Sequence, residues 1–306
     1  MSYLAELMLR LSAGVFCLDA ATRVRHKMFL IHAQNDDGGF SGRKGPSDLY
    51  YTGFAMRGLT LLGELDEGVA GRVTGLLKDR LAPRLPGVDF ISLITCAVLA
   101  ETATGRKAFA ELGIDARQAV GEFFRPFRRD DGGYAKTPRG GQSSTYHTFL
   151  VAACQQLLGA PLEEPKRMVE LTRSRQRDDG GFVELDAMRH SGTNPTAAAV
   201  GLLKICDALD RPTAAAATGF LARMQTPEGG MRANQRIGVA DLLSTFTAVV
   251  ALHDTNSAEA IATGAALRFA ESLQMPRGGF RAGAWDDAAD VEYTFYGLGV
   301  LGLLAS

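Results

Sequence analysis

Asp178-Asp179-Gly180-Gly181-Phe182 is the stretch that decides the fold, because close copies of it return along the chain at a regular interval. The copies are Asp36-Asp37-Gly38-Gly39-Phe40, Asp130-Asp131-Gly132-Gly133-Tyr134, Glu228-Gly229-Gly230-Met231 and Arg277-Gly278-Gly279-Phe280. Their first glycines stand at 38, 132, 180, 229 and 278, so the last three steps are 48, 49 and 49 residues, and the first step, 94, is almost two of them. A fixed period of this length predicts a repeat architecture.

A second column with the same period begins some ten residues after each glycine pair, and it predicts the start of a helix. Its six copies are Asp48-Leu49-Tyr50-Tyr51-Thr52, Asp89-Phe90-Ile91-Ser92-Leu93, Ser144-Thr145-Tyr146-His147-Thr148, Gly192-Thr193-Asn194-Pro195-Thr196, Asp241-Leu242-Leu243-Ser244-Thr245 and Asp290-Val291-Glu292-Tyr293-Thr294. Asp and Ser are good N-caps because their side-chain oxygen accepts a backbone N–H of the first turn. The second copy has no glycine pair, and Leu85-Pro86-Gly87 takes its place.

Each helix start leads into an apolar segment, such as 197–203 or 246–252, which predicts a buried inner helix. A more amphipathic outer helix follows, as in 258–273, and leads into the next glycine pair. Sustained period-2 alternation is absent, so no strand is expected. We therefore predict an all-α protein of six helix-pair repeats, with twelve main helices in a single domain over 1–306.

The last inner helix, 294–304, is apolar to the chain end, so another element must cover it. The simplest cover is the first repeat, which predicts a closed (α/α)6 toroid. In this arrangement the glycine pairs form the joints of one rim. The helix N-termini converge on a central cavity that suits a long apolar ligand with an anionic head.

The composition excludes several classes of function. The net charge of −1 does not favour binding to nucleic acid or to an anionic membrane. Cys17, Cys96, Cys154 and Cys206 lie far apart, with no metal-type spacing. Charges in the N-terminal stretch argue against a signal peptide, and no apolar run is seen to approach 18 residues. We therefore expect a cytoplasmic protein without a membrane span.

The Q/R-x-D-D-G-G-F phrase, with its period of about 48 residues, resembles the prenyltransferase and squalene-cyclase repeat. The chain as a whole resembles a protein prenyltransferase β subunit, and the stretch from Leu9-Arg10-Leu11-Ser12-Ala13-Gly14 to Gly38-Gly39-Phe40 is similar to the Rab geranylgeranyltransferase β subunit especially. The resemblance implies an (α/α)6 barrel, an isoprenoid diphosphate as ligand, and a helical-repeat α subunit as partner. A homodimer is the alternative assembly.

The resemblance also implies that the family's zinc site is degenerate here. The family takes its ligands from D-x-C-Y-S and D-x-x-H-T motifs, whose positions match 241–245 and 290–294. Asp241 is kept, but Leu243 stands at the cysteine position and Tyr293 at the histidine position. We therefore expect no zinc and take Asp241 and Tyr293 as the catalytic candidates. A cluster of Asp241, Asp290 and Glu292 could hold Mg²⁺, although two N-caps and a surface glutamate are the favoured interpretation.

The diphosphate side of the family site is better kept. His190 matches the family histidine before the fourth inner helix, and Arg232 or Arg236 matches its arginine. The family lysine and tyrosine have no counterpart. Aromatic residues on the first turns of inner helices are expected to line the prenyl cavity, with ordinary core as the alternative: Tyr50, Tyr51, Tyr146 and Phe246, together with Tyr293 and Phe295. His147 is expected to be a satisfied core histidine.

Three functions remain open at this point. The first is a prenyltransferase-like enzyme that binds farnesyl or geranylgeranyl diphosphate and transfers the prenyl group without the family zinc. The second is a non-catalytic isoprenoid-binding or scaffold protein. The third is a terpenoid cyclase, which is disfavoured because Leu243 and Ser244 stand where its D-x-D-D motif would fall.

Overall fold

The computed structural model describes residues 1–81 and 85–305. Over these residues it contains fourteen α-helices, two short 3₁₀ helices and isolated β-bridges, with no strand, so the expected all-α class is confirmed. Contacts divide the chain into two compact units. The first unit comprises Met1–Leu7 with Val120–Phe269, and the second comprises Met8–Ala119 with Ala270–Ser306. The organisation as a single domain stays a prediction.

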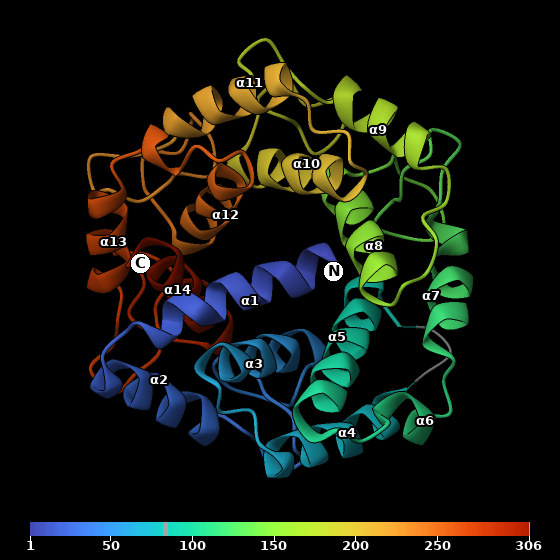
Figure 1. Ribbon diagram of the computed structural model, residues 1–306, viewed down its shortest axis with the longest axis vertical. Coiled ribbons are helices and arrows are strands. Elements are labelled where there is room, and N and C mark those ends of the chain that lie inside the picture. Colours follow the sequence, from blue (N-terminus) through green and yellow to red (C-terminus); the bar gives the residue numbers. More distant parts are fainter. Residues whose placement is uncertain (82–84, 306) are drawn as a thin grey trace. The chain divides into compact units, whose positions relative to one another are not determined.

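Inner and outer helices alternate along the chain as expected (Figure 1). The inner helices are α3 (Leu49–Leu62), α5 (Gly87–Thr104), α8 (Thr145–Leu157), α10 (Thr193–Ile205), α12 (Leu242–Asp254) and α14 (Val291–Leu304). The outer helices are α2 (Ala20–His32), α4 (Glu67–Arg80), α7 (Ala116–Phe124), α9 (Pro165–Ser174), α11 (Arg211–Ala222) and α13 (Thr263–Ser272). Two further α-helices, α1 (Tyr3–Phe16) and α6 (Ala108–Leu112), are additions to the expected twelve.

The first glycine of each phrase is needed both for its backbone conformation and for close packing. Gly180 has φ of 84°, which side chains with a Cβ rarely adopt. A Cβ there would lie 2.4 Å from the carbonyl oxygen of Ala216 on α11. The same close approach recurs at the other four phrases, which meet Arg72 of α4, Arg167 of α9, Ala265 of α13 and Arg25 of α2. Each glycine pair thus packs on the outer helix of the next repeat.

The threonine in the helix-start column fastens the glycine phrase to the inner helix. Thr196 accepts a hydrogen bond from the Phe182 N–H at 2.9 Å and donates one to the Gly192 carbonyl at 2.7 Å. Phe182 also forms β-bridges with Gln176 and Gly192. Threonines 52, 148, 245 and 294 make the same pair of bonds in their repeats. This explains why threonine recurs with the period.

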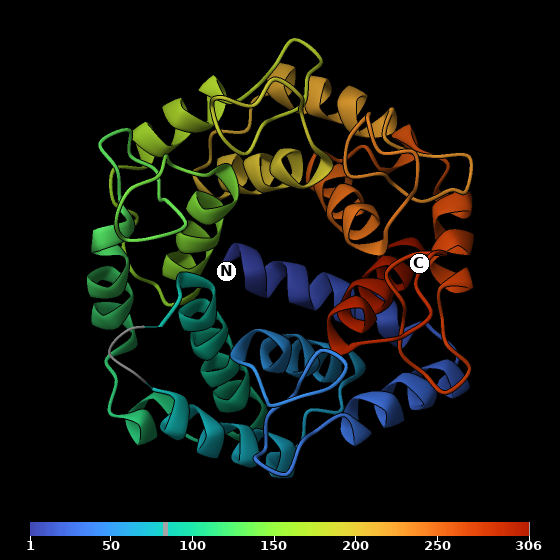
Figure 2. The same cartoon turned by 180° about the vertical axis from the view of Figure 1, so that it is seen from behind.

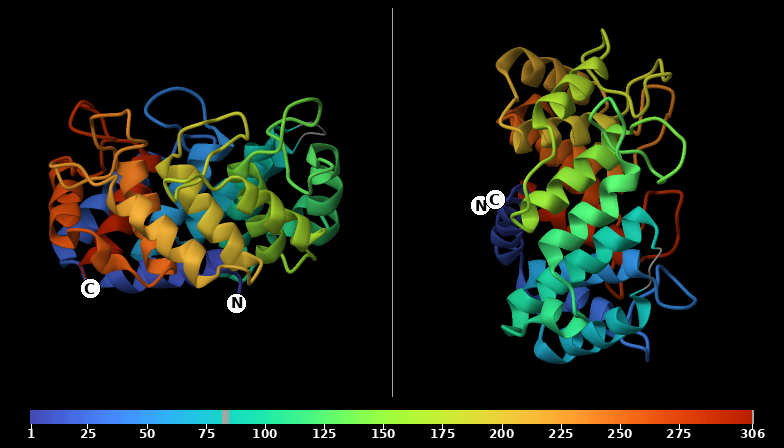
Figure 3. Two further views of the ribbon diagram at one scale, coloured as in Figure 1. Left: turned by 90° about the horizontal axis from the view of Figure 1, so that it is seen from above. Right: turned by 90° about the vertical axis from the view of Figure 1, so that its right-hand side faces the viewer.

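In the first unit, α10 packs between α8 and α12. The Tyr3 hydroxyl donates to Asp254 at 2.7 Å, and Lys204 pairs with the same carboxylate at 2.9 Å, so the first turn of α1 is tied to the C-terminal ends of α10 and α12. The loops before α8, α10 and α12 project from one side of this unit (Figure 3).

In the second unit, the last inner helix meets the first helix pair (Figure 2). The apolar helix α14 packs against α3, and a Cβ on Gly302 would lie 2.8 Å from the Leu11 carbonyl of α1. The buried His26 of α2 accepts the Gly279 N–H at 3.0 Å and stacks on Phe280 at 4.7 Å. The last inner helix is therefore covered by the first repeat, as expected, and by α1 as well.

Three expectations need correction. Helix α5 begins at Gly87 with Pro86 as its N-cap, so Asp89 lies inside the first turn, where burial raises the pKa of its carboxyl. By length and composition the 18-residue α5 could cross a membrane, so the expectation about apolar runs is wrong; more than half of it is buried, and it packs against α3 and α4. The outer helix expected over 258–273 begins only at Thr263, after a 3₁₀ turn at Ala258–Ala260.

Candidate functional site

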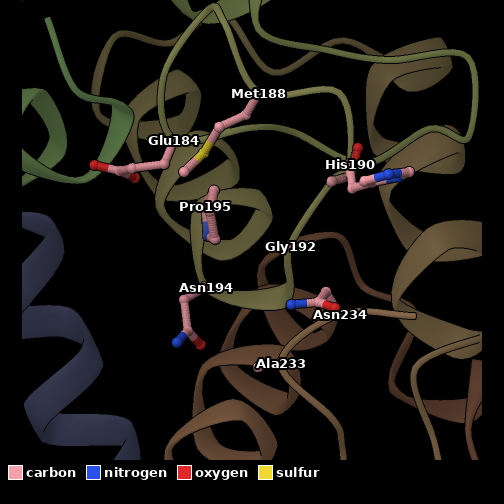
Figure 4. A pocket seen from close by; sticks show the side chains of 9 residues that line it. Glu184, Met188, His190, Gly192, Asn194, Pro195, Ala233 and Asn234 are labelled. Atoms are coloured by element: carbon pink, nitrogen blue, oxygen red, sulfur yellow. The ribbon is translucent and has the colours of Figure 1, made fainter. Parts of the chain in front are cut away.

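A cavity of about 250 Å³ lies in the first unit, where the loop before α10 meets the loop before α12 (Figure 4). It is lined by Glu184, Met188, His190, Ser191, Gly192, Asn194, Pro195, Ala233 and Asn234. Of the residues expected to bind the substrate, His190 is among those that line it.

The start of α10 differs from the starts of its two neighbours. Ser144 caps α8 by accepting from the His147 N–H, and Asp241 caps α12 by accepting from the Ser244 N–H. The N-cap of α10 is Gly192, which has no side chain to accept a hydrogen bond. The Thr193 N–H donates to the Ala233 carbonyl at 2.9 Å and Pro195 has no N–H, so the first turn of α10 presents the Asn194 N–H and the positive end of the helix dipole to the cavity.

Two amide side chains at the cavity are held in fixed orientations. The Asn194 Oδ1 accepts from the Thr247 hydroxyl at 2.7 Å, and the Asn234 Oδ1 accepts from the Arg236 N–H at 3.0 Å. With each oxygen occupied, the amide nitrogen of each side chain is left as a hydrogen-bond donor. Together with the His190 imidazole and the uncapped helix start, these donors suit an anion.

Glu184 brings a carboxylate to the edge of the cavity, but this group serves another helix. Its two oxygens accept from the Ser144 hydroxyl and from the Tyr146 N–H at the start of α8. Figure 4 shows the carboxylate and the His190 imidazole at opposite sides of the cavity, pointing away from each other. Its negative charge therefore complements the N-terminus of α8 rather than that of α10.

The two predicted arginines are not among the residues that line the cavity. The Arg232 guanidinium donates to the Arg223 carbonyl at 3.1 Å, at the end of α11, and the Arg232 carbonyl accepts from the Thr193 hydroxyl. Arg236 is exposed two residues beyond Asn234, on the same loop. Both arginines are therefore near the cavity along the chain, but the Arg232 side chain is anchored at the end of α11.

The remaining candidates in the first unit lie at the first turns of α8 and α12. Both Asp241 oxygens are used in capping, since they accept from the N–H and the hydroxyl of Ser244 at 2.7 Å each, and burial raises the pKa of the carboxyl. Phe246 is buried, whereas Tyr146 is exposed and lies edge-on against His147. The Nδ1 atom of His147 lies 2.9 Å from the Ser144 hydroxyl, as expected of a satisfied histidine.

The candidates in the second unit gather around Glu292 on α14. The Tyr50 and Tyr296 hydroxyls donate to one Glu292 oxygen at 2.6 and 3.0 Å. Tyr50 lies edge-on to Tyr51, and Tyr293 lies edge-on to Tyr296. Phe54 and Phe295 complete the cluster, with the Arg57 guanidinium over both rings at 5.0 and 5.9 Å. A carboxylate among aromatic rings is an environment that favours positive charge.

An ion pair that the sequence did not indicate lies beside this cluster. The Arg43 guanidinium, on the first repeat, reaches Asp286 at 2.5 Å and Asp290 at 3.5 Å on the sixth. Asp290 also caps α14 by accepting from the Tyr293 N–H. Burial raises the pKa of Asp290 to about 6 despite these partners. No repeated pattern marks Arg43 or Asp286, because the pairing joins loops distant in sequence.

The residues present do not fit the family zinc. The carboxylate of Asp241 is occupied in capping α12, and Leu243 and Tyr293 supply no ligand at the other two positions. In the described part of the chain, no group of three His, Cys, Asp or Glu side chains could hold a metal ion, so the proposed Mg²⁺ cluster gains no support.

Sequence reasoning missed both asparagines of the cavity. Asn194 could have been found by comparing columns, because the second helical residue is Tyr50, Tyr146, Leu243 or Glu292 in other repeats and an amide only here. Asn234 had no such signal, since its place at the cavity depends on the path of its loop.

The comparisons with known proteins agree on the fold. The chain matches the family model of the prenyltransferase alpha-alpha toroid domain over residues 17–88, 87–199 and 141–306. No curated protein sequence matches the chain. Among solved structures, Candida albicans protein geranylgeranyltransferase-I complexed with GGPP is similar, with 13% identity, a TM-score of 0.75, and coverage of 92% of this chain and 90% of that one.

Other similar structures carry different activities on the same fold. A type II terpene cyclase from Scytonema, MstE, has 15% identity and a TM-score of 0.63, with coverage of 99% of this chain and 98% of that one. A glycosidase in complex with glucose has 16% identity and a TM-score of 0.54, with coverage of 94% and 98%. Likeness at this level shows the fold alone. The family model covers nearly the whole length, so the chain belongs to the prenyltransferase alpha-alpha toroid family.

Proposed function

We propose that the chain binds an isoprenoid diphosphate, with the diphosphate in the cavity at the start of α10. The observation that carries the proposal is the uncapped first turn of α10, placed beside the amide donors of Asn194 and Asn234 and the imidazole of His190. The ligand's phosphate oxygens would take the place of the missing N-cap side chain. The similar geranylgeranyltransferase structure, which holds GGPP, supports this class of ligand.

The size of the cavity limits which part of the ligand it takes. At about 250 Å³ it is smaller than a usual pocket for a drug-sized ligand, so it would hold the charged diphosphate and leave the prenyl chain outside. The tail would then lie along the inner helices of the first unit, α8, α10 and α12. Tyr146 and Phe246, on the first turns of α8 and α12, are its proposed aromatic contacts.

The proposed reaction is transfer of the prenyl group to an acceptor other than a zinc-bound thiolate. His190 and the two amides would stabilise the diphosphate as its bond to the prenyl carbon breaks, because charge grows on the departing oxygens. Asp241 and Tyr293 would not contact the diphosphate. They would contribute only by holding the first turns of α12 and α14 in place. A cytoplasmic location, and a helical-repeat subunit or a second copy as partner, belong to the same proposal.

Calorimetric titration with farnesyl and geranylgeranyl diphosphate tests the proposal. His190→Ala is expected to weaken binding about tenfold, since it removes one charge-assisted bond. Asn194→Asp is expected to weaken it at least tenfold, because it places a carboxylate against the diphosphate. His32→Ala, which removes an exposed histidine of α2, is the matched control and should bind as the parent chain does. Binding that is absent, or unchanged in Asn194→Asp, would contradict the proposal.

A second candidate, proton-initiated cyclisation, is favoured by one observation. The carboxyl of Asp290 has a pKa of about 6 and adjoins Glu292 and the aromatic residues of α3 and α14, so part of it is protonated near neutral pH. Product analysis separates the candidates, because transfer releases diphosphate and proton-initiated cyclisation retains it. Tight binding with neither product would favour the non-catalytic alternative.

A further inference from the structure

Exposed apolar side chains of the first unit gather on the loops before its inner helices. Met188 is 46% exposed on the loop before α10, and Ile237 and Val239 are 41% and 48% exposed on the loop before α12. Among the described residues, α9 and α11, which form the outer surface of the same unit, carry no large exposed apolar side chain. Single exposed apolar residues are ordinary, but their concentration on two neighbouring loops is not.

The tips of these loops, and of the loop before α8, are also positively charged. Residues 136–142, 187–190 and 233–239 contain Lys136, Arg139, Arg189 and Arg236, with no Asp or Glu. Asp186 precedes the second tip and is paired with Arg175 at 3.1 Å. The tips therefore carry four cationic side chains in a chain whose net charge is −1, and the whole-chain balance concealed this local excess.

The three tips lie on one side of the unit. Helix α10 packs against both α8 and α12, so the loops that enter these helices are neighbours, and Figure 3 shows them projecting in the same direction. The cavity at the start of α10 lies at this side, since Met188 and Asn234 come from two of the loops and line it.

We propose that the first unit docks through these three tips onto a bilayer with anionic headgroups. Met188, Ile237 and Val239 enter the interfacial region, and the four cations meet the lipid phosphates. A bilayer fits this surface better than a protein partner does. The three apolar side chains are divided between two loops that also carry Arg189 and Arg236, whereas a protein interface needs a contiguous apolar core. This docking is independent of the ligand proposed for the cavity.

Vesicle co-sedimentation of the full chain tests the docking. Binding is expected to phosphatidylcholine vesicles that contain phosphatidylglycerol, to be weaker to phosphatidylcholine alone, and to fall with added salt. Each cation that is neutralised should lower the partition coefficient about fivefold. The double variant Arg189→Gln/Arg236→Gln should therefore lower it about twenty-five-fold. Absence of binding to the anionic vesicles would overturn the proposal.

A matched pair of apolar variants separates insertion from general adhesion. Met188→Ser/Ile237→Ser/Val239→Ser is expected to lose most of the binding to anionic vesicles. Val24→Ser/Met28→Ser removes two exposed apolar side chains from α2 and should leave binding unchanged. Equal losses in the two variants would contradict docking through the tips. Self-association of the parent chain that only the triple variant abolishes would assign the surface to a second copy and overturn the proposal.

A fluorescence experiment avoids reliance on a multiple variant. Trp285 is the only tryptophan of the chain, so Trp285→Phe/Ile237→Trp places a single reporter on the loop before α12. Brominated phosphatidylcholine in the anionic vesicles should quench this reporter, whereas a tryptophan that replaces Met28 in the same background should stay unquenched. Equal quenching, or none at position 237, would refute insertion.

Discussion

Lowering the pH is expected to weaken the fold through His26, which joins the first helix pair to the last. Burial, the dominant cause, lowers the pKa of His26 from 6.5 to about 4, and the nearby Arg25 adds to this effect. Nδ1 accepts the Gly279 N–H and therefore carries no proton, while Nε2 faces the Gln274 oxygen at 3.0 Å. Protonation at Nδ1 would break the bond to Gly279 and bury a charge.

The sign and size of the effect follow from the pKa of His26 in the unfolded chain, 6.5, and in the folded chain, about 4. Between them the unfolded chain binds more protons than the folded one, so stability is full above about pH 6.5 and falls as the pH drops toward about 4. The full loss is about 3.4 kcal/mol, and from about pH 7.5 to about pH 5 the loss is about 2 kcal/mol. Asp290 works in the opposite direction, because its raised pKa of about 6 stabilises the fold as the pH falls.

Because Asp290 has the opposite pH dependence, a variant is needed to isolate the contribution of His26. His26→Gln keeps an acceptor for Gly279 and a donor for Gln274 but cannot titrate. Urea unfolding followed by circular dichroism at both pH values should show a pH-dependent loss about 2 kcal/mol smaller in His26→Gln than in the parent chain. His32→Gln, on the exposed end of the same helix, should behave as the parent does. A difference below about 0.5 kcal/mol would refute the reasoning.

Two further predictions concern the repeated phrase, and urea unfolding checks both. Thr196→Val is expected to lower the free energy of unfolding by about 1–3 kcal/mol, because the buried Phe182 N–H loses its acceptor; an unchanged stability would show that the threonine column is not a fastening. Gly278→Ala is expected to cost more than about 2 kcal/mol, since φ is 92° and the new Cβ would lie 2.4 Å from the Arg25 carbonyl. Gly75→Ala on α4 meets open space and should instead be neutral or stabilise by up to about 1 kcal/mol; equal costs at the two glycines would contradict the packing argument.

The sequence predicted those parts of the fold that depend on local chemistry. Asp48, Ser144, Asp241 and Asp290 all cap inner helices as expected, because a cap is set by one side chain and the turn that follows it. The second repeat was misplaced at Asp89 because its glycine pair is absent, and the actual start has no capping side chain to mark it.

The candidate site was less predictable because side-chain direction depends on tertiary contacts. His190 was found from its place in a phrase, and it does line the cavity. Arg232 was assigned from the same kind of spacing, yet its guanidinium is bound to the Arg223 carbonyl. Spacing fixes where a backbone lies, whereas the choice between two directions for a long side chain depends on acceptors from other elements.

Comparison among the repeats separates what the fold requires from what a ligand requires. Asp179 accepts from the Gly181 N–H and the Ser191 hydroxyl, and the pairs Asp37–Ser47 and Asp131–Ser143 repeat this arrangement. In the last two repeats both partners are replaced together, and alanine stands at the serine position. The glycine and the threonine persist in all five phrases, so close helix packing is the requirement that the period preserves.

The start of α10, in contrast, lacks a side chain that would stabilise the fold. An N-cap side chain is worth about 1 kcal/mol, and four of the other inner helices have one at this position of the repeat. Gly192 forgoes it, although the backbone there, with φ of −127°, is open to any residue. The glycine relieves a close contact, because a Cβ there would lie 3.1 Å from the Pro195 ring and 3.4 Å from the Ala233 carbonyl oxygen. The same absence of a side chain leaves the helix N-terminus open to the oxygens of a ligand.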